Sequence, residues 1–318
     1  MKTIIGYVAD YFREEWDAGY FTIVGCLLGG LFFLNYGYGF ERVITSSLPF
    51  PTGHIAFYFG FYLIPYLITH VAYTLVKRGA GVLRTRQFWT LSLGTFIVLA
   101  VYIALHDGPW YLLRTQPELF AAVPMELQPF ATRCASNVLP LTLMGIPLVG
   151  YWWKADRQDM PLYGFTAKTI DLRPYFLLLL FLLPIVAAAS FTPDFIRAYP
   201  RYKFGFPDHL SAGEQRPLIG IFELCYGADF VFVEFFFRGF MILAFTRILG
   251  SKAILPMVVV YALIHFEKPM LEALSSIVGG LVLGIISYRT KSIYGGVIMH
   301  LGIAFMMEIA GTLQMMAR

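Results

Sequence analysis

Long apolar blocks are the feature that most constrains this chain. They follow one another with only short, charged connections between them, and we place them at 20–40, 55–76, 87–105, 138–153, 174–191, 218–246, 254–267, 271–288 and 293–313. An α-helix rises about 1.5 Å per residue, so about 20 apolar residues cross the roughly 30 Å hydrocarbon core of a bilayer. The blocks therefore predict an all-α fold, a polytopic transmembrane helical bundle of about 8–9 spans surrounded by membrane lipids.

Composition excludes several other classes of protein. Hydrophobic residues make up 58% of the chain and charged residues 14%, and the mean hydropathy is +0.66. A soluble domain carries about 25% charged residues, and a disordered chain has few large apolar residues. The three cysteines show no CxxC spacing, so neither a disulfide framework nor a metal knuckle is indicated. The net charge of +4 does not require an anionic partner, and we expect no binding of nucleic acid.

The first 18 residues predict an amphipathic segment. Ile4, Val8 and Phe12 recur at helical spacing, while Asp10 and Glu14 interrupt any continuous apolar region. A secretory signal peptide is excluded for that reason. Two interpretations stay open: a helix lying on the membrane surface, and a helix packed on the protein's own loops.

Basic residues indicate the orientation. Lys and Arg gather in the connections around 77–86, 154–173, 247–252 and 289–291, which lie on one side if the N-terminus is cytoplasmic. The basic connection 197–216 departs from this pattern. We expect an integral, multi-pass protein of a bacterial inner membrane with a cytoplasmic N-terminus.

Ionisable residues are concentrated in the apolar segments after about residue 217. They are Glu223, Asp229, Glu234, Arg238, His265, Glu272, His300 and Glu308. Each charge at the bilayer centre costs about 2.5–3.5 kcal/mol, so such a group of residues predicts a functional site. Glu234 and Arg238 are four residues apart and therefore share one helix face.

Three chemistries suit this set of residues. In hydrolysis, a buried carboxylate takes a proton from water while histidines stabilise the developing oxyanion. In a metal site, two histidines and one or two glutamates would hold a divalent ion such as zinc, although the HExxH motif is absent. In a proton or ion pathway, buried titratable groups pass the charge along.

Three short motifs carry a resemblance to a known family. Glu234 to Gly239 reads EFFFRG, Tyr261 to His265 reads YALIH, and His300 follows in the last apolar block. The region from about 218 to 312 resembles the CAAX-protease and bacteriocin-processing (CPBP) family of intramembrane endopeptidases, whose motifs are EExxxR, FxxxH and, as the third, a histidine followed four residues later by a small polar residue. The resemblance implies a protease domain over 217–314, preceded by N-terminal transmembrane spans over 19–216 and the amphipathic segment 1–18.

The resemblance also implies residue roles. Glu234 is expected to activate water, His265 and His300 to polarise the peptide carbonyl, and Arg238 to hold Glu234. Supporting roles fall to Glu272, which would orient a histidine, and to Tyr261, the aromatic residue of the second motif. If a divalent metal is used, Glu234, His265 and His300 are its expected ligands. The expected substrate is a membrane-associated or lipidated peptide or protein.

Two positions depart from the family pattern. The first glutamate of EExxxR is replaced by Val233. Ala304 stands four residues after His300, where the family has a small polar residue, often asparagine. These changes keep a second interpretation open, a catalytically weakened relative that acts as a binding or immunity protein. A proton-coupled transporter is a third interpretation, and the chain shows no inverted repeat in its favour.

Overall fold

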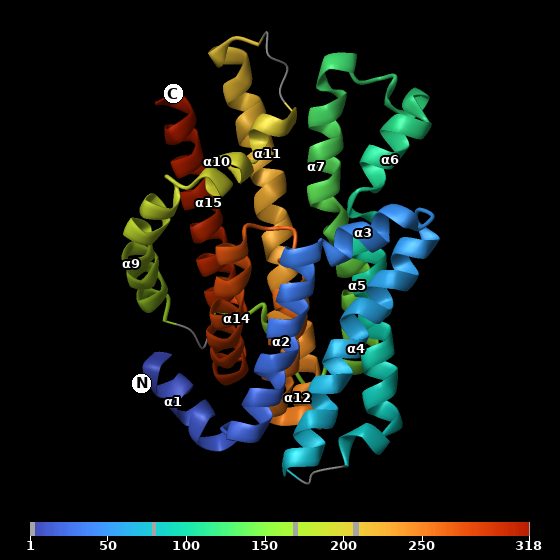
Figure 1. Cartoon of the computed structure of the whole chain (residues 1–318), viewed down its shortest axis with the longest axis vertical. Coiled ribbons are helices and arrows are strands. Elements are labelled where there is room, and N and C mark those ends of the chain that lie inside the picture. The colour runs from blue at the N-terminus through green and yellow to red at the C-terminus, as the bar shows by residue number, and fades with distance from the viewer. Residues whose placement is uncertain (1–3, 78–80, 168–170, 206–209, 318) are drawn as a thin grey trace. The chain divides into compact units, whose positions relative to one another are not determined.

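The structure is helical throughout its described part. The computed structural model describes residues 4–77, 81–167, 171–205 and 210–317, and these residues contain helices and turns but no strand. The predicted all-α class is therefore confirmed (Figure 1). Residues 1–3 of the predicted amphipathic segment lie outside the described residues.

Two compact units are interleaved along the chain: the first contains Met1–Val101, Leu148–Asp171 and Glu234–Gly296, and the second contains Tyr102–Pro147, Leu172–Val233 and Val297–Arg318. The predicted domain boundary at 216/217 stays a prediction.

The first unit holds the N-terminal helices and the segment with the Glu234 motif. Its helices are α1 (Ile4–Glu15), α2 (Ala18–Tyr38), α3 (Phe40–Ser47), α4 (Thr52–Lys77), most of α5 (Arg86–His106), most of α8 (Ile146–Tyr151), α12 (Thr246–Leu249), α13 (Ile254–Leu263) and α14 (Met270–Thr290). The unit also contains the 3₁₀-helical segments η1 (Val82–Arg84), η6 (Leu162–Gly164) and η9 (Gly250–Ala253) and the π-helical segments η5 (Trp152–Asp156) and η8 (Phe235–Ala244).

The second unit is built on two long helices. These are α11 (Ala212–Glu234) and α15 (Tyr294–Met316). The last residue of α11, Glu234, and the first three residues of α15 belong to the first unit. The other elements are α6 (Gly108–Thr115), η2 (Pro117–Phe120), η3 (Met125–Leu127), α7 (Gln128–Pro140), η4 (Leu141–Gly145), α9 (Arg173–Ala189), α10 (Pro193–Ala198) and η7 (Tyr202–Gly205).

Six helical stretches of the described chain are long and apolar enough to span a membrane. They are Ala18–Tyr38, Thr52–Lys77, Arg86–His106, Met125–Asp156, Met270–Thr290 and Tyr294–Met316. The predicted count of 8–9 is not confirmed, because the predicted spans 174–191, 218–246 and 254–267 are not among these six. Of the helices there, α9 has 17 residues and α13 only 10. At 1.5 Å per residue, α13 is about 15 Å long, half of a hydrocarbon core.

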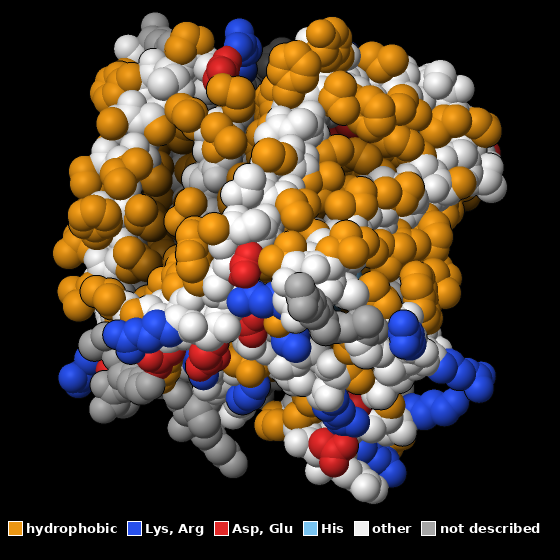
Figure 2. Space-filling view, turned by 60° about the horizontal axis from the view of Figure 1, so that its bottom comes forward, with side chains coloured by type: hydrophobic (Ala, Val, Ile, Leu, Met, Phe, Trp, Pro, Cys, Tyr) orange, Lys and Arg blue, Asp and Glu red, His pale blue; other side chains and the backbone are white. Residues whose placement is uncertain are grey.

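The surfaces of these helices suit lipid rather than water. Leu75 is 72% exposed and Phe33 is 64% exposed, and α9 exposes Leu177 and Phe181 to a similar degree. Hydrophobic side chains cover much of the face shown in Figure 2. Large apolar side chains exposed in such numbers mark a membrane-facing surface. Together with the six long apolar helices, they define an integral, multi-pass membrane protein.

Helix α13 forms the core of the first unit. All ten of its residues are buried, and it packs against α4 and α14. A helix that is hydrophobic on every side is stable only when neighbours cover every side. This is why the apolar block at 254–267 is an interior helix, although its composition resembles that of a span.

The N-terminal helix packs on the protein itself. Helix α1 contacts α14 and η9, Tyr11 is buried, and the hydroxyl of Ser251 donates to the Glu15 carboxylate. Arg289 also forms an ion pair with Glu14, with 2.7 Å between Nη2 and Oε1. That pair is partly exposed and contributes at most about 1 kcal/mol. Of the two interpretations of the amphipathic segment, these contacts favour packing on the protein.

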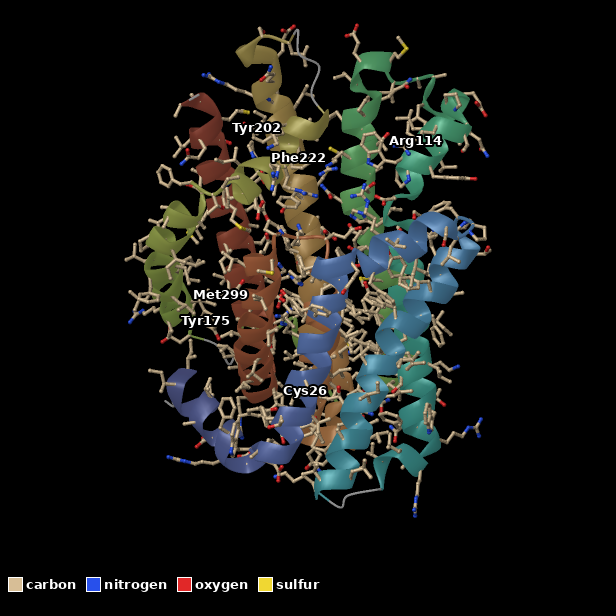
Figure 3. The ribbon with its side chains drawn as sticks, viewed as in Figure 1. Cys26, Arg114, Tyr175, Tyr202, Phe222 and Met299 are labelled. Atoms are coloured by element: carbon tan, nitrogen blue, oxygen red, sulfur yellow. The ribbon has the colours of Figure 1, made fainter. Side chains whose placement is uncertain are left out.

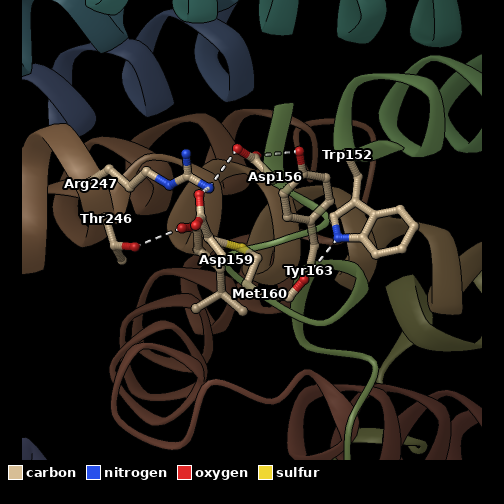
Figure 4. A network of polar contacts seen from close by, with 8 residues as sticks. Trp152, Asp156, Asp159, Met160, Tyr163, Thr246 and Arg247 are labelled. Atoms are coloured by element: carbon tan, nitrogen blue, oxygen red, sulfur yellow. Dashed lines mark hydrogen bonds and ion pairs between the residues drawn. The ribbon is translucent and has the colours of Figure 1, made fainter. Parts of the chain in front are cut away.

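A polar network fixes the connection that follows η5 in the first unit. The Arg247 guanidinium lies 2.8 Å from carboxylate oxygens of both Asp156 and Asp159, and the Tyr163 hydroxyl donates to Asp156 at 2.7 Å (Figure 4). Tyr163 has a φ of 35°, which costs about 1–3 kcal/mol in a residue with a side chain. Its full burial and its hydrogen bond compensate for that strain.

The same connection then holds the start of α15. The backbone N–H of Ile293 donates to the Gly164 carbonyl at 3.0 Å, and the Ser292 hydroxyl donates to the Thr166 carbonyl at 2.6 Å. Gly164 has a φ of 85°, and a Cβ there would lie 2.8 Å from Leu243, so only glycine fits. These contacts set the position of Gly296, four residues beyond Ser292.

Candidate active site

Glu234 and Arg238 form a fully buried ion pair. Glu234 ends α11, Arg238 lies four residues on in η8, and Arg238 Nη1 is 2.8 Å from Glu234 Oε1. Both side chains are 0% exposed, and the N–H direction does not align for a hydrogen bond, so charge attraction is the main interaction. A buried charge requires a partner of opposite charge. The pair expected from the sequence spacing is therefore confirmed.

Tyr261 of α13 covers the other side of Arg238. The guanidinium carbon of Arg238 lies 3.9 Å from the centre of the Tyr261 ring, which is the geometry of a cation–π contact. Arg238 itself sits in a π-helical segment, a local widening that often occurs at functional sites. Tyr261 is 5% exposed and also packs edge-on against Phe237. The guanidinium is thus held between a carboxylate and an aromatic face.

Gly296 at the start of α15 borders the Glu234 carboxylate. A Cβ built on Gly296 would lie 2.0 Å from Glu234 Oε2 and 3.0 Å from its carboxyl carbon. No side chain fits at that distance, so the carboxylate contacts the helix backbone directly. Sequence reasoning missed Gly296, although the Gly295-Gly296 pair shortly before His300 was a visible signal of close packing.

His265 lies in the turn that follows α13, within the same unit. Its Nδ1 is 2.7 Å from the carbonyl oxygen of Tyr261, and its ring lies 4.6 Å from the Tyr261 ring. Since a carbonyl only accepts, Nδ1 carries the proton. In the neutral histidine Nε2 is then an acceptor, and only the imidazolium donates from both nitrogens. The side chain is half-buried, which leaves Nε2 a route to a ligand.

The C-terminal end of α2 holds the turn that carries His265. The Tyr36 hydroxyl is 2.8 Å from the carbonyl oxygen of Lys268 and 3.4 Å from that of His265, and Asn35 Nδ2 donates to the Phe266 carbonyl at 3.2 Å. Carbonyls after a helix end need donors, and these side chains supply them. Nothing in the sequence pattern linked Asn35 and Tyr36 to a motif more than 220 residues away.

Glu41 completes this corner of the first unit. Its backbone N–H donates to Asn35 Oδ1 at 3.2 Å, and its side chain is 5% exposed. Burial and the nearby charge of Glu267 raise the pKa of Glu41 to about 8, although a hydrogen bond with Tyr58 opposes the shift. Glu41 is therefore mostly protonated at neutral pH.

The raised pKa of Glu41 predicts a pH-dependent stability. The unfolded chain releases the proton near pH 4.5 while the folded protein keeps it to about pH 8, so the free energy of unfolding falls as pH rises through this window. The slope is at most about 1.4 kcal/mol per pH unit. Glu41→Gln removes this contribution, and melting temperatures of both proteins in detergent from pH 5 to 8 measure it. Equal slopes for the two proteins would contradict the assignment.

Glu272 and His300 are the other two predicted site residues. Glu272 lies in the first turn of α14, half-buried, and acts electrostatically on Tyr261 and Tyr36, but its orienting role stays a prediction. His300 belongs to the second unit, where its ring lies 4.4 Å from the ring of Phe230. Its place beside Glu234 and His265 stays a prediction as well.

Both positions that depart from the family pattern are apolar and buried. Val233 is 7% exposed, and Ala304 is 1% exposed within an apolar cluster of the second unit that includes Phe222, Tyr226 and Phe230. No polar function is provided at either position.

The remaining acidic residues of the second unit have structural partners. Tyr102 donates to Asp229 at 3.0 Å, and both oxygens of Glu308 accept the backbone N–H of Arg201 at 2.8 Å. Glu223 interacts with Glu308. Hydrogen bonds within the second unit therefore account for Asp229 and Glu308.

A metal does not fit the candidate site as it stands. Glu234 already faces the positive charge of Arg238, which repels a cation, and within the described residues no group of three or more His, Cys, Asp or Glu is placed to hold an ion. The ligand set of Glu234, His265 and His300 therefore stays a prediction.

The C-terminal region is similar to a known protein family. Residues 222–306, which are 85 of the 318 residues, match the family model described as type II CAAX prenyl endopeptidase Rce1-like. This match confirms the resemblance to CAAX-type intramembrane proteases, a class of hydrolases, and it covers Glu234, His265 and His300. No curated protein and no solved structure matches the chain.

Proposed function

We propose that the protein is an intramembrane endopeptidase that hydrolyses a peptide bond of a membrane-associated or lipidated peptide or protein. The buried Glu234–Arg238 pair carries the proposal, because a carboxylate in an apolar interior is suited to proton transfer. The family match over 222–306 supports it. Arg238 holds the carboxylate, and Tyr261 holds Arg238.

The reaction uses Glu234 as the base. Glu234 takes a proton from water, the water oxygen bonds to the peptide carbonyl carbon, and the carbonyl oxygen becomes an oxyanion. His265 and His300 donate hydrogen bonds to that oxygen, for which His265 must be protonated because its Nδ1–H is already donated to Tyr261. The C–N bond then breaks, and the proton on Glu234 passes to the leaving amine.

Sequence spacing supports a role for His300. It follows Gly296 by four residues on α15, and residues four apart in a helix lie on the same face. Gly296 in turn borders the Glu234 carboxylate. Glu272 is proposed to orient a histidine.

Protein termini test the proposal. Wild type and Glu234→Gln are expressed at matched levels, and the peptide termini in the two membrane preparations are compared. Wild type should produce new termini, and their amount should be at least about a hundredfold lower with Glu234→Gln, because loss of a general base costs 10²–10⁴-fold in rate. The double variant Glu234→Gln/Arg238→Gln, which leaves no buried charge, is the control for folding. Cleavage that survives in either variant would contradict the role of Glu234.

The buried Val233 and Ala304 favour a second candidate function, a catalytically weakened relative that binds its target as an immunity protein. Identical termini in wild type and Glu234→Gln membranes, at equal abundance, would support this function.

The proposed location for either function is a bacterial inner membrane, with the N-terminus in the cytoplasm. Single cysteines introduced into α1 and labelled from either side of the membrane test this orientation.

A further inference from the structure

The second unit contains a polar pocket that no step of the proposed reaction uses. Its lining comes from the end of α5 and the residue after it, from α6, α7 and α11, and from the segment between α10 and η7: His106, Asp107, Trp110, Arg133, Ser136, Asn137, Arg201, Phe222 and Tyr226. Figure 3 marks Phe222, on the α11 side of this pocket, and Arg114, which belongs to α6 but does not line it. The cavity volume is about 30 Å³.

Hydrogen-bond donors predominate in the pocket. Two guanidinium groups, from Arg133 and Arg201, share it and repel each other. Ser136 is 2% exposed and Asn137 is 7% exposed, and Ser136 Oγ and Asn137 Nδ2 are buried with no hydrogen-bond partner among the described residues. Buried donors without partners cost about 1–3 kcal/mol each, so an arrangement like this suits a ligand that accepts hydrogen bonds.

The negative charges nearby neutralise only part of this positive charge. Asp107 lines the pocket and acts electrostatically on Arg133, but its side chain is 84% exposed and it supplies one negative charge against two guanidinium groups. Glu308 acts electrostatically on Arg133, yet it already accepts the backbone N–H of Arg201 and does not line the pocket. The pocket therefore has positive charge that an anion can neutralise.

Size and depth indicate which anion fits. A water molecule needs about 10–15 Å³ of a cavity, so a space of about 30 Å³ admits a group as small as the oxygens of a phosphate. His106 is the last residue of the candidate span Arg86–His106, and Trp110 follows it, so the pocket opens near the membrane–water interface. Lipid phosphates lie at that depth, and basic pockets between spans bind lipid headgroups.

Apolar surface for acyl chains lies next to the pocket. Val138, which follows Asn137 in α7, is 40% exposed, and Leu141 is 52% exposed. We propose that the pocket formed by Arg133, Ser136, Asn137 and Arg201 binds the phosphate group of an anionic membrane lipid. This assignment is independent of the proposed proteolysis.

Lipid binding by the delipidated, full-length protein in detergent tests the assignment. Native mass spectrometry and thermal unfolding compare phosphatidylglycerol, phosphatidylcholine and inorganic phosphate as probes. Phosphatidylglycerol should bind and raise the melting temperature more than phosphatidylcholine, whose choline is repelled by the arginines. Arg201→Gln should weaken its binding at least tenfold, because a hydrogen bond to a charged group is lost, and Ser136→Ala should weaken it by a smaller factor.

Arg114→Gln is the matched control. It removes the same charge from an exposed position of the same unit, and it should bind phosphatidylglycerol as wild type does. Equal binding by wild type, Arg201→Gln and Ser136→Ala would overturn the proposal. Stabilisation by inorganic phosphate but not by phosphatidylglycerol would overturn the lipid assignment and leave a site for free phosphate. If Arg201→Gln fails to fold, Ser136→Ala, which removes one oxygen atom, decides the result.

Discussion

Arg238→Gln should lower the free energy of unfolding by about 3–5 kcal/mol, since it leaves the Glu234 carboxylate buried and without its charge partner. The side chain also loses its contact with the Tyr261 ring, 3.9 Å away. Denaturant unfolding of the purified protein in detergent measures the change. Glu234→Gln should have a comparable effect, because it leaves Arg238 unpaired.

The double variant Glu234→Gln/Arg238→Gln separates stability from catalysis. It buries no charge, so its free energy of unfolding should return to within about 1–2 kcal/mol of wild type. It should nevertheless remain unable to cleave, because the base is gone. A single variant as stable as wild type would mean that water reaches the pair and that its burial is not what stabilises this part of the fold.

Gly296→Ala should reduce cleavage by about a hundredfold. Its methyl group would lie 2.0 Å from Glu234 Oε2, so the carboxylate has to move by more than 1 Å, and a displacement of about 1 Å costs roughly that factor in rate. Overpacking of the interior should also lower stability by about 1–3 kcal/mol. Initial rates of substrate cleavage in reconstituted vesicles measure the first effect.

Gly279→Ala is the control for this substitution. Gly279 lies in α14, and a Cβ there would meet nothing within 4 Å. It should cleave as wild type does. If Gly296→Ala cleaves equally well, the Glu234 carboxylate is not held in the position that the proposed reaction requires.

Local patterns in the sequence determined the helical class, the membrane location and the Glu234–Arg238 pair. A long apolar run is costly to expose to water and therefore predicts a membrane span without knowledge of the fold. Two residues four apart in a helix lie on the same face, which also follows from the sequence alone. The same local character explains why the family motifs were found from residues alone and agree with the match over 222–306. The span count is not confirmed where length and burial disagree, as in α13, which is apolar because protein surrounds it.

Only the tertiary structure decided what surrounds these residues. Gly296 against Glu234, Tyr261 over Arg238, and Tyr36 on the carbonyls of His265 and Lys268 are contacts between segments far apart in the chain. The pocket of the second unit likewise joins residues from α5 to α11. Packing of this kind depends on the shapes of both partners at once, and a periodic pattern describes only one of them. The sequence therefore determined which residues carry charge inside the membrane, and the fold determined which groups neutralise, orient and confine them.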